Sequence, residues 1–186
     1  VNAAGQVTHE VLSDGGVRDY VYDIRGRLQS ATDSVSGTMT FDYNTADRLT
    51  KITYPNGRWL EYSYDLAGRR TRIGDQAGFT TNYEYDTSGQ LVRLRNASNA
   101  VIDEYSYDMA GRLIREDKAN GTYTLYDYDA VGRQSSIFHY SPLGAVNSKF
   151  LYTFDAAGRR DTQTTNDGVW TYTYDLSDQL VRGVFV

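Results

Sequence analysis

Side chains that could act as a general base or a nucleophile are sparse in this sequence. It has two histidines, His9 and His139, which stand 130 positions apart, and no cysteine. The lack of cysteine excludes thiol catalysis, disulfides and cysteine metal sites. Serine and aspartate are common enough for a Ser-His-Asp hydrolase, but no Gly-x-Ser-x-Gly turn accompanies either histidine. We therefore expect no catalytic residue and no enzyme activity, with a hydrolase as the least favoured class.

Other chemistries lack their motifs as well. The chain has no phosphate-binding P-loop, no dinucleotide-binding glycine fingerprint and no HExxH motif, so we expect no cofactor and no metal. The formal net charge is −5, from 24 acidic and 19 basic residues. This balance argues against a nucleic-acid partner, which favours a basic stripe. No apolar stretch has the length that a membrane span requires.

The carboxylates recur at a regular spacing, which could indicate an acid pair or a calcium ladder. Calcium needs several oxygens that converge on each ion, and no such loop is visible. One member of the row is Asn44, which carries no charge. An Asp that opens a turn can bond to its own backbone two residues on, so we interpret the row as turn caps. The row consists of Asp23, Asn44, Asp65, Asp86, Asp108, Asp129, Asp155 and Asp175.

These acids belong to a repeated motif, Tyr-x-Tyr-Asp-x-x-Gly-Arg. Eight copies start at residues 20, 41, 62, 83, 105, 126, 152 and 172, and a partial repeat occupies residues 1–19. We therefore predict that residues 1–186 form a single array of repeats. Four copies that match the motif in full supply the structural residues Tyr20, Tyr22, Asp23, Gly26, Arg27, Tyr62, Tyr64, Asp65, Gly68, Arg69, Tyr105, Tyr107, Asp108, Gly111, Arg112, Tyr126, Tyr128, Asp129, Gly132 and Arg133.

The motif predicts the elements that carry it. Its two aromatic residues are two positions apart and would share one face of a strand. Asp-x-x-Gly would close a bulged hairpin, with a positive φ at the glycine. Asp47 and Asp178 replace that glycine, and Asp tolerates the left-handed region. A second turn lies between motifs, so each repeat of about 21 residues gives two short strands.

The fold class that follows is all-β. We predict tandem antiparallel β-hairpins, about sixteen strands in all, which form one curved, meandering sheet because long open sheets curl. With 17 Tyr and 6 Phe, any core would consist largely of aromatic rings.

Two rows of side chains have a structural and a functional interpretation. The Arg row could bind anions or sulfated sugars, or could pair with the motif Asp and stack on Tyr. The Tyr rows could form a platform for carbohydrate, or could pack as a core. We favour the structural interpretation in both cases. The Arg row comprises Arg27, Arg48, Arg69, Arg112, Arg133 and Arg159, completed by Gln6, Gln90 and Gln179.

One insertion breaks the regular spacing. The first aromatic residues of the motifs are 20 to 22 positions apart, except for one interval of 26 residues that contains Phe138–Asn147. The turns between motifs vary in length, and variable loops are where contacts are gained. His139 and Tyr140 of this insertion are therefore our candidates for ligand or partner contacts.

The motif resembles that of the YD-repeat family, also called the Rhs-repeat family, over essentially the whole chain. The resemblance implies a segment of a hollow β-shell. Bacterial polymorphic toxins enclose a toxic domain in such a shell, insecticidal toxin complexes use a similar cocoon, and teneurins use a related barrel in cell adhesion. The resemblance also implies a bacterial protein that is secreted or displayed at the cell surface. Its partners would be the rest of the YD-repeat chain or an enclosed cargo or toxin domain.

The sequence thus favours a non-catalytic structural module, a wall segment of such a shell. The alternative is a carbohydrate-binding or adhesion module that uses exposed Tyr and Arg rows, with a glycan as partner. Both ends of the chain cut through repeats, so we expect a piece of a longer chain. Cut repeats leave strand edges without partners, and we expect self-association through them.

Overall fold

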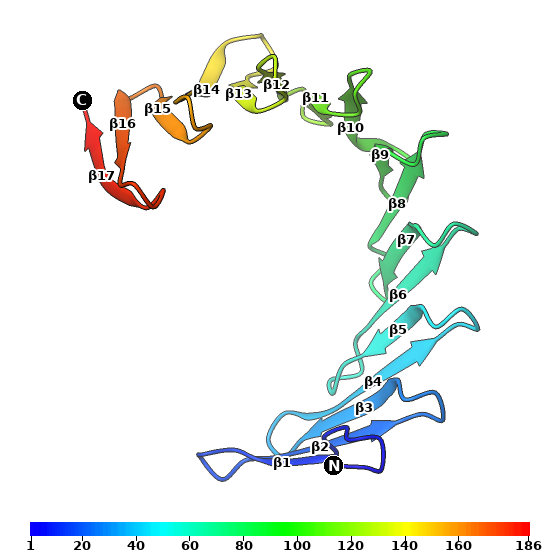
Figure 1. Cartoon of the computed structure of the whole chain (residues 1–186). Helices are drawn as coiled ribbons and strands as arrows, with labels where there is room; N and C mark the ends of the chain where they lie inside the picture. The colour runs from blue at the N-terminus through cyan, green and yellow to red at the C-terminus, as the bar shows by residue number, and fades with distance from the viewer. The chain divides into compact units, whose positions relative to one another are not determined.

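The computed structural model describes all 186 residues and is all-β, without a helix (Figure 1). The predicted fold class of antiparallel hairpins is confirmed. There are seventeen strands rather than about sixteen, because the partial repeat adds β1. The strands are β1 (His9–Val11), β2 (Val17–Tyr22), β3 (Leu28–Asp33), β4 (Gly37–Tyr43), β5 (Leu49–Thr53), β6 (Trp59–Tyr64), β7 (Arg70–Asp75), β8 (Thr80–Tyr85), β9 (Leu91–Arg95), β10 (Val101–Tyr107), β11 (Leu113–Lys118), β12 (Tyr123–Tyr128), β13 (Gln134–Tyr140), β14 (Val146–Phe154), β15 (Arg160–Thr164), β16 (Val169–Tyr174) and β17 (Leu180–Phe185).

The strands form a sheet in which neighbours along the chain pair antiparallel. Contacts divide the chain into two compact units. The first comprises Val1–Glu84 with Arg95–Ala100, and the second comprises Tyr85–Leu94 with Val101–Val186. In the first unit β1 to β8 follow one another as a meander, and in the second β10 to β17 do the same.

The Asp-x-x-Gly segment forms the predicted hairpin turn. In the first motif the Asp23 N–H donates to the Arg27 carbonyl at 2.9 Å, and the Gly26 N–H donates to the Asp23 carbonyl at 2.9 Å. The strand register shifts by a bulge at Tyr22. The φ of Gly26 is 78°, and Asp47 and Asp178 adopt 60° and 63°. The positive φ expected at the glycine position, and its tolerance of Asp, are therefore confirmed.

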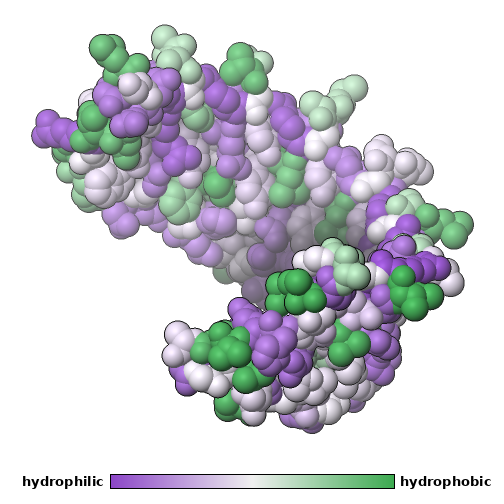
Figure 2. Space-filling view, turned by 60° about the horizontal axis from the view of Figure 1, so that its bottom comes forward, coloured by the Kyte–Doolittle hydropathy of each residue, from purple (hydrophilic) through white to green (hydrophobic).

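The structure has no buried hydrophobic residue. The buried residues are Gly74, Thr81, Thr124 and Ser136, and most motif tyrosines are half-buried. Figure 2 shows hydrophobic and hydrophilic side chains intermingled over the surface. The expectation of a core of aromatic rings is wrong, since each strand packs against its neighbours within one layer and no second layer covers the rings.

The insertion at Phe138–Asn147 lengthens a hairpin instead of adding a loop. β13 has 7 residues and β14 has 9, and they pair from Ser136 with Leu151 to Tyr140 with Val146. Only residues 141–145 form the turn between them. Extra residues therefore extend the strands toward the edge that carries the variable turns.

Candidate functional site: a ladder between repeats and an open pocket

The motif carboxylate holds its turn together. Asp108 Oδ1 accepts the backbone N–H groups of Ala110 and Arg112, both at 2.9 Å, and Asp108 Oδ2 accepts the Arg112 Nε–H at 2.7 Å. The same pair of backbone bonds recurs at Asn44, with Ala46 and Arg48 at 3.0 Å. The corresponding ion pairs are Asp23–Arg27, Asp65–Arg69, Asp129–Arg133 and Asp155–Arg159. No group of three or more His, Asp or Glu side chains is placed to hold a metal ion.

Replacing Asp108 tests this cap. We expect Asp108→Ala to lower the urea midpoint clearly, because two turn N–H groups and the Arg112 guanidinium lose their acceptor. Asp108→Asn should lower it much less, because Asn44 shows that an amide oxygen accepts the same two N–H groups. Fluorescence during urea unfolding measures both midpoints. If the two variants lower the midpoint equally, the ion pair with Arg112 stabilises the turn and the bonds to the backbone N–H groups do not.

The caps also predict a dependence of stability on pH. The side-chain hydrogen bond from Arg69 lowers the pKa of Asp65, and that from Arg159 lowers the pKa of Asp155. Backbone N–H groups of Ser36 and Val35, helped by Arg18, lower the pKa of Asp33 to about 2.

Because these folded-state pKa values lie below the ordinary value of about 4, the stabilisation is present above about pH 4 and is lost as the pH falls through them. We expect the urea midpoint to fall between about pH 4 and pH 2. The difference in midpoint between the wild type and Asp65→Asn should shrink over that range. A midpoint independent of pH in this window would contradict the prediction.

Five motif arginines also reach the next repeat. The Arg112 guanidinium lies over the Tyr128 ring at 4.7 Å from its centroid, and Arg27 lies over Tyr43 at 4.6 Å. Arg48, Arg133 and Arg159 lie in the same way over Tyr64, Phe154 and Tyr174. Where Gln replaces Arg, its amide makes the link: Gln6 donates to the Gly26 carbonyl at 2.8 Å, and Gln90 donates to the Gly111 carbonyl at 3.0 Å.

The second tyrosine of the motif completes the link. The Tyr128 hydroxyl donates to the Leu113 carbonyl at 2.8 Å, 15 residues back along the chain. The same bond joins Tyr22 to Val7, Tyr43 to Leu28, Tyr64 to Leu49, Tyr107 to Leu91, and Tyr174 to Arg160. Arginine and tyrosine thus form one continuous ladder of contacts within each unit, which we call the Arg–Tyr ladder.

The histidines lie apart from this ladder and from each other. His139 Nδ1 is 2.9 Å from Thr124 Oγ1, and its ring meets Phe150 edge-on at 6.3 Å. Tyr140 stacks on the Tyr123 ring at 4.6 Å. His9 Nδ1 lies 2.7 Å from Asp19 at an exposed position. Both insertion residues therefore make contacts within the sheet, and their contact with a ligand or partner stays a prediction.

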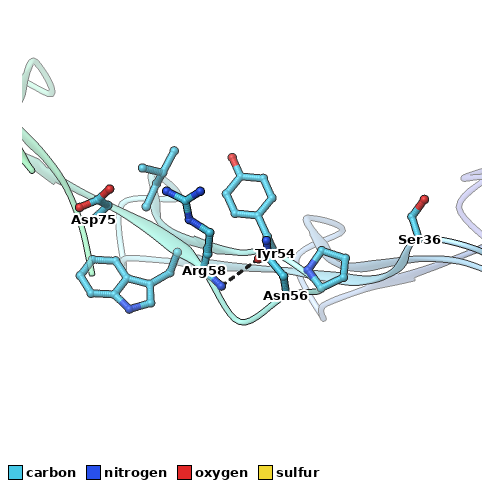
Figure 3. Close-up of a pocket in the computed structure, with 8 residues that line it drawn as sticks. Ser36, Tyr54, Asn56, Arg58 and Asp75 are labelled. Carbon is cyan, nitrogen blue, oxygen red and sulfur yellow. Dashed lines mark hydrogen bonds between the residues drawn. The ribbon is translucent and has the colours of Figure 1, made fainter. Parts of the chain in front are cut away.

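The first unit has an open pocket with a volume of about 680 Å³, which no sequence motif predicts (Figure 3). Its walls come from two turns and two strands that are distant in sequence, so no local motif could mark it. The nearest signal is Arg58, which follows a turn and has no acidic residue next to it in the chain. The lining residues are Ser36, Tyr54, Pro55, Asn56, Arg58, Trp59, Leu60 and Asp75.

Comparison with known proteins shows which family and which solved structures this chain resembles. Residues 2–143 match the family model of the teneurin YD-shell. A crystal structure of TcdB2-TccC3 aligns with a TM-score of 0.69 and 17% identity, covering 97% of this chain and 13% of that chain. The Photorhabdus luminescens Tc holotoxin pore aligns with a TM-score of 0.68 and 16% identity, covering 98% of this chain and 13% of that chain. The complex TcdB2-TccC3-Cdc42 aligns with a TM-score of 0.67 and 16% identity, covering 97% of this chain and 12% of that chain.

At these identities the likeness shows a shared fold. The chain spans about an eighth of the length of the solved chains that it matches. A comparison with curated protein sequences finds no match. The chain has no helix that is long and apolar enough to cross a membrane.

Proposed function

Since this chain belongs to the teneurin YD-shell family, we propose that it is a non-catalytic wall segment of a shell that surrounds a cargo or toxin polypeptide. We propose further that residues 1–186 are one array within a longer bacterial protein that is secreted or displayed at the cell surface. The observation that carries the proposal is the Arg–Tyr ladder. Within each unit it ties successive repeats together, and it uses the motif residues for that purpose.

The ladder suits a wall because every contact repeats with the motif. Each hairpin adds one rung, so the sheet can be extended without a new core. The side chains of the sheet are mostly half-buried or exposed, so they are available for contact with an enclosed chain. A wall built in this way needs no reactive constellation, which agrees with histidines that contact a threonine and an aspartate separately.

Protease protection of the full-length protein that contains this chain tests the proposal. We expect an enclosed polypeptide to resist trypsin in the native particle and to become sensitive when the wall opens on heating. Weakening the ladder by Tyr128→Ala should lower the temperature at which protection is lost, while Tyr152→Phe should leave it unchanged. A polypeptide that is cleaved in the native particle as fast as a free peptide would rule out a closed wall.

The alternative of a carbohydrate platform is less favoured by the contacts. The motif arginines are engaged by Asp carboxylates and by ring faces, so they have few donors left for a glycan. The second tyrosine of most motifs has its hydroxyl bonded to a backbone carbonyl.

Unpaired strand edges lead to a prediction about association. β1 pairs with β2, and β17 pairs with β16, so each has one edge with free backbone groups in the 186-residue chain. We expect this chain to self-associate, because such edges accept a further strand. Light scattering across a concentration series should show a mass that rises above the 21.0 kDa of the monomer. A constant monomer mass at high concentration would contradict the prediction.

A further inference from the structure

The pocket in the first unit has a cationic side chain without a partner. It lies where the turn between β5 and β6 meets the end of β7, and Arg58 and Asp75 both line it (Figure 3). The guanidinium of Arg58 makes no hydrogen bond, ion pair or ring contact, and Arg58 is exposed. Arg18, by contrast, pairs with Asp33 at 3.1 Å. In a chain of net charge −5, a free guanidinium beside a pocket offers a specific place for an anion.

The backbone around Arg58 is held in place. The Tyr54 N–H donates to the Arg58 carbonyl at 2.7 Å, and the Arg58 N–H donates to the Asn56 side chain at 3.0 Å. Pro55 lies against Gly37, where an added Cβ would come within 3.0 Å of the Pro55 Cβ. These contacts hold the backbone of the turn, so the point from which the Arg58 side chain projects is defined before any ligand arrives.

Most of the remaining lining is apolar, and the exceptions are Ser36, Asn56 and Asp75. Tyr54, Pro55, Trp59 and Leu60 supply ring and aliphatic surface. The Asp75 Oδ1 atom accepts the N–H groups of Ala77 at 2.9 Å and Phe79 at 3.0 Å. Those two bonds offset part of its charge and leave its second oxygen as an acceptor. The pocket thus combines a cationic fork, an apolar wall and the Asp75 carboxylate, with the neutral polar side chains of Ser36 and Asn56 at its margin.

We propose that this pocket binds the C-terminal residue of a polypeptide chain. The terminal carboxylate matches the Arg58 guanidinium in a two-bond pair. An apolar side chain of the terminal residue packs against Tyr54, Pro55 and Leu60, and its backbone N–H donates to Asp75. A saccharide fits less well, because a sugar ring needs hydrogen-bond partners around its rim and most of this wall is apolar. The proposal does not depend on a closed shell.

Small probes separate the parts of this recognition in the intact protein. N-acetyl-L-leucine carries the carboxylate, the N–H and the apolar side chain. N-acetyl-L-leucinamide lacks the carboxylate, and 4-methylpentanoate lacks the N–H. We expect saturation-transfer NMR to show N-acetyl-L-leucine binding with a Kd of about 1 mM, as befits a fragment of this size. Binding of the amide should be at least about tenfold weaker, since a charged pair is lost.

Variants connect the binding to the pocket. Arg58→Gln should weaken the binding of N-acetyl-L-leucine at least about tenfold. Arg58→Lys should weaken it less, because an ammonium group keeps the charge but cannot form the two-bond pair. Arg182→Gln is the matched control, since Arg182 is exposed and also lacks a bonded partner, and it should change nothing. Unchanged thermal unfolding would show that the variants remain folded.

Three results would overturn the proposal. One is equal binding of the acid and its amide. Another is equal binding of 4-methylpentanoate, which would indicate a site for free apolar acids rather than chain ends. The third is preferential binding of D-glucuronate, which would indicate a saccharide site. A failure of the shell proposal would appear in protease protection and would leave these binding ratios unchanged.

Discussion

Tyr128→Ala is expected to lower the free energy of unfolding of the second unit by about 2–4 kcal/mol, the range for a large aromatic truncation reduced for partial exposure. The Arg112 guanidinium lies over the Tyr128 ring, 4.7 Å from its centroid, and the Tyr128 hydroxyl donates to the Leu113 carbonyl at 2.8 Å. Alanine removes both links between neighbouring repeats and leaves a gap in the one layer that the sheet has. Urea unfolding followed by tyrosine and tryptophan fluorescence would measure the change.

A second substitution separates the hydroxyl from the ring. Tyr128→Phe keeps the stacking on Arg112 and should cost about 1 kcal/mol, the typical value for one hydrogen bond. Tyr152→Phe is the matched control. Arg160 lies over its ring at 4.1 Å, but its hydroxyl makes no hydrogen bond, so the change should be close to zero. If both phenylalanine variants lose the same stability, the bond to Leu113 contributes nothing.

The damage should also stay local. In repeat arrays each unit contacts only its neighbours, so stability is close to a sum of local terms. Hydrogen exchange in Tyr128→Ala should therefore quicken most in β11 to β13 and least in β16 and β17. A uniform increase across all strands of the second unit would indicate that the unit unfolds only as a whole.

Much of this arrangement could be predicted because it is local. Asp-x-x-Gly specifies its own turn through bonds between residues at most four positions apart, as at Asp108 and Arg112. The spacing of two between motif tyrosines likewise specifies their common face. These features depend on backbone geometry that the sequence carries directly.

The rest depends on how neighbouring repeats are staggered. The hydroxyl of Tyr43 meets the Leu28 carbonyl, 15 residues away, and no residue type marks a carbonyl as an acceptor. The chain divides into two compact units near residues 84–100, and the spacing of the motifs does not predict this boundary. The pocket at Arg58 is likewise assembled from turns that belong to different repeats. Such features follow from sheet register, which a repeat pattern alone does not fix.

The glycine of the motif leads to the second large effect. Gly68 has a φ of +88°, and a Cβ added there would lie 2.7 Å from Arg48 Nη2. Gly78 has a φ of +87°, with no atom within 4 Å of its added Cβ. Gly78→Ala should therefore cost only the strained backbone, about 1–2 kcal/mol. Gly68→Ala should cost about 1 kcal/mol more, because Arg48 must leave the Asp65 carbonyl that it reaches at 3.2 Å.

Aspartate at the same position should behave differently. Where the chain itself has Asp instead of Gly, the arginine of the preceding repeat pairs with it: Arg27 with Asp47, and Arg159 with Asp178, each at 2.6 Å. Arg48 stands in the same relation to position 68. Gly68→Asp should thus recover most of the stability that Gly68→Ala loses, since Asp tolerates the left-handed region and pairs with Arg48. At Gly78, where the open space offers no arginine, aspartate should gain little over alanine. An equal gain at both positions in urea unfolding would show that backbone preference alone, and not the arginine of the preceding repeat, makes Asp acceptable in this turn.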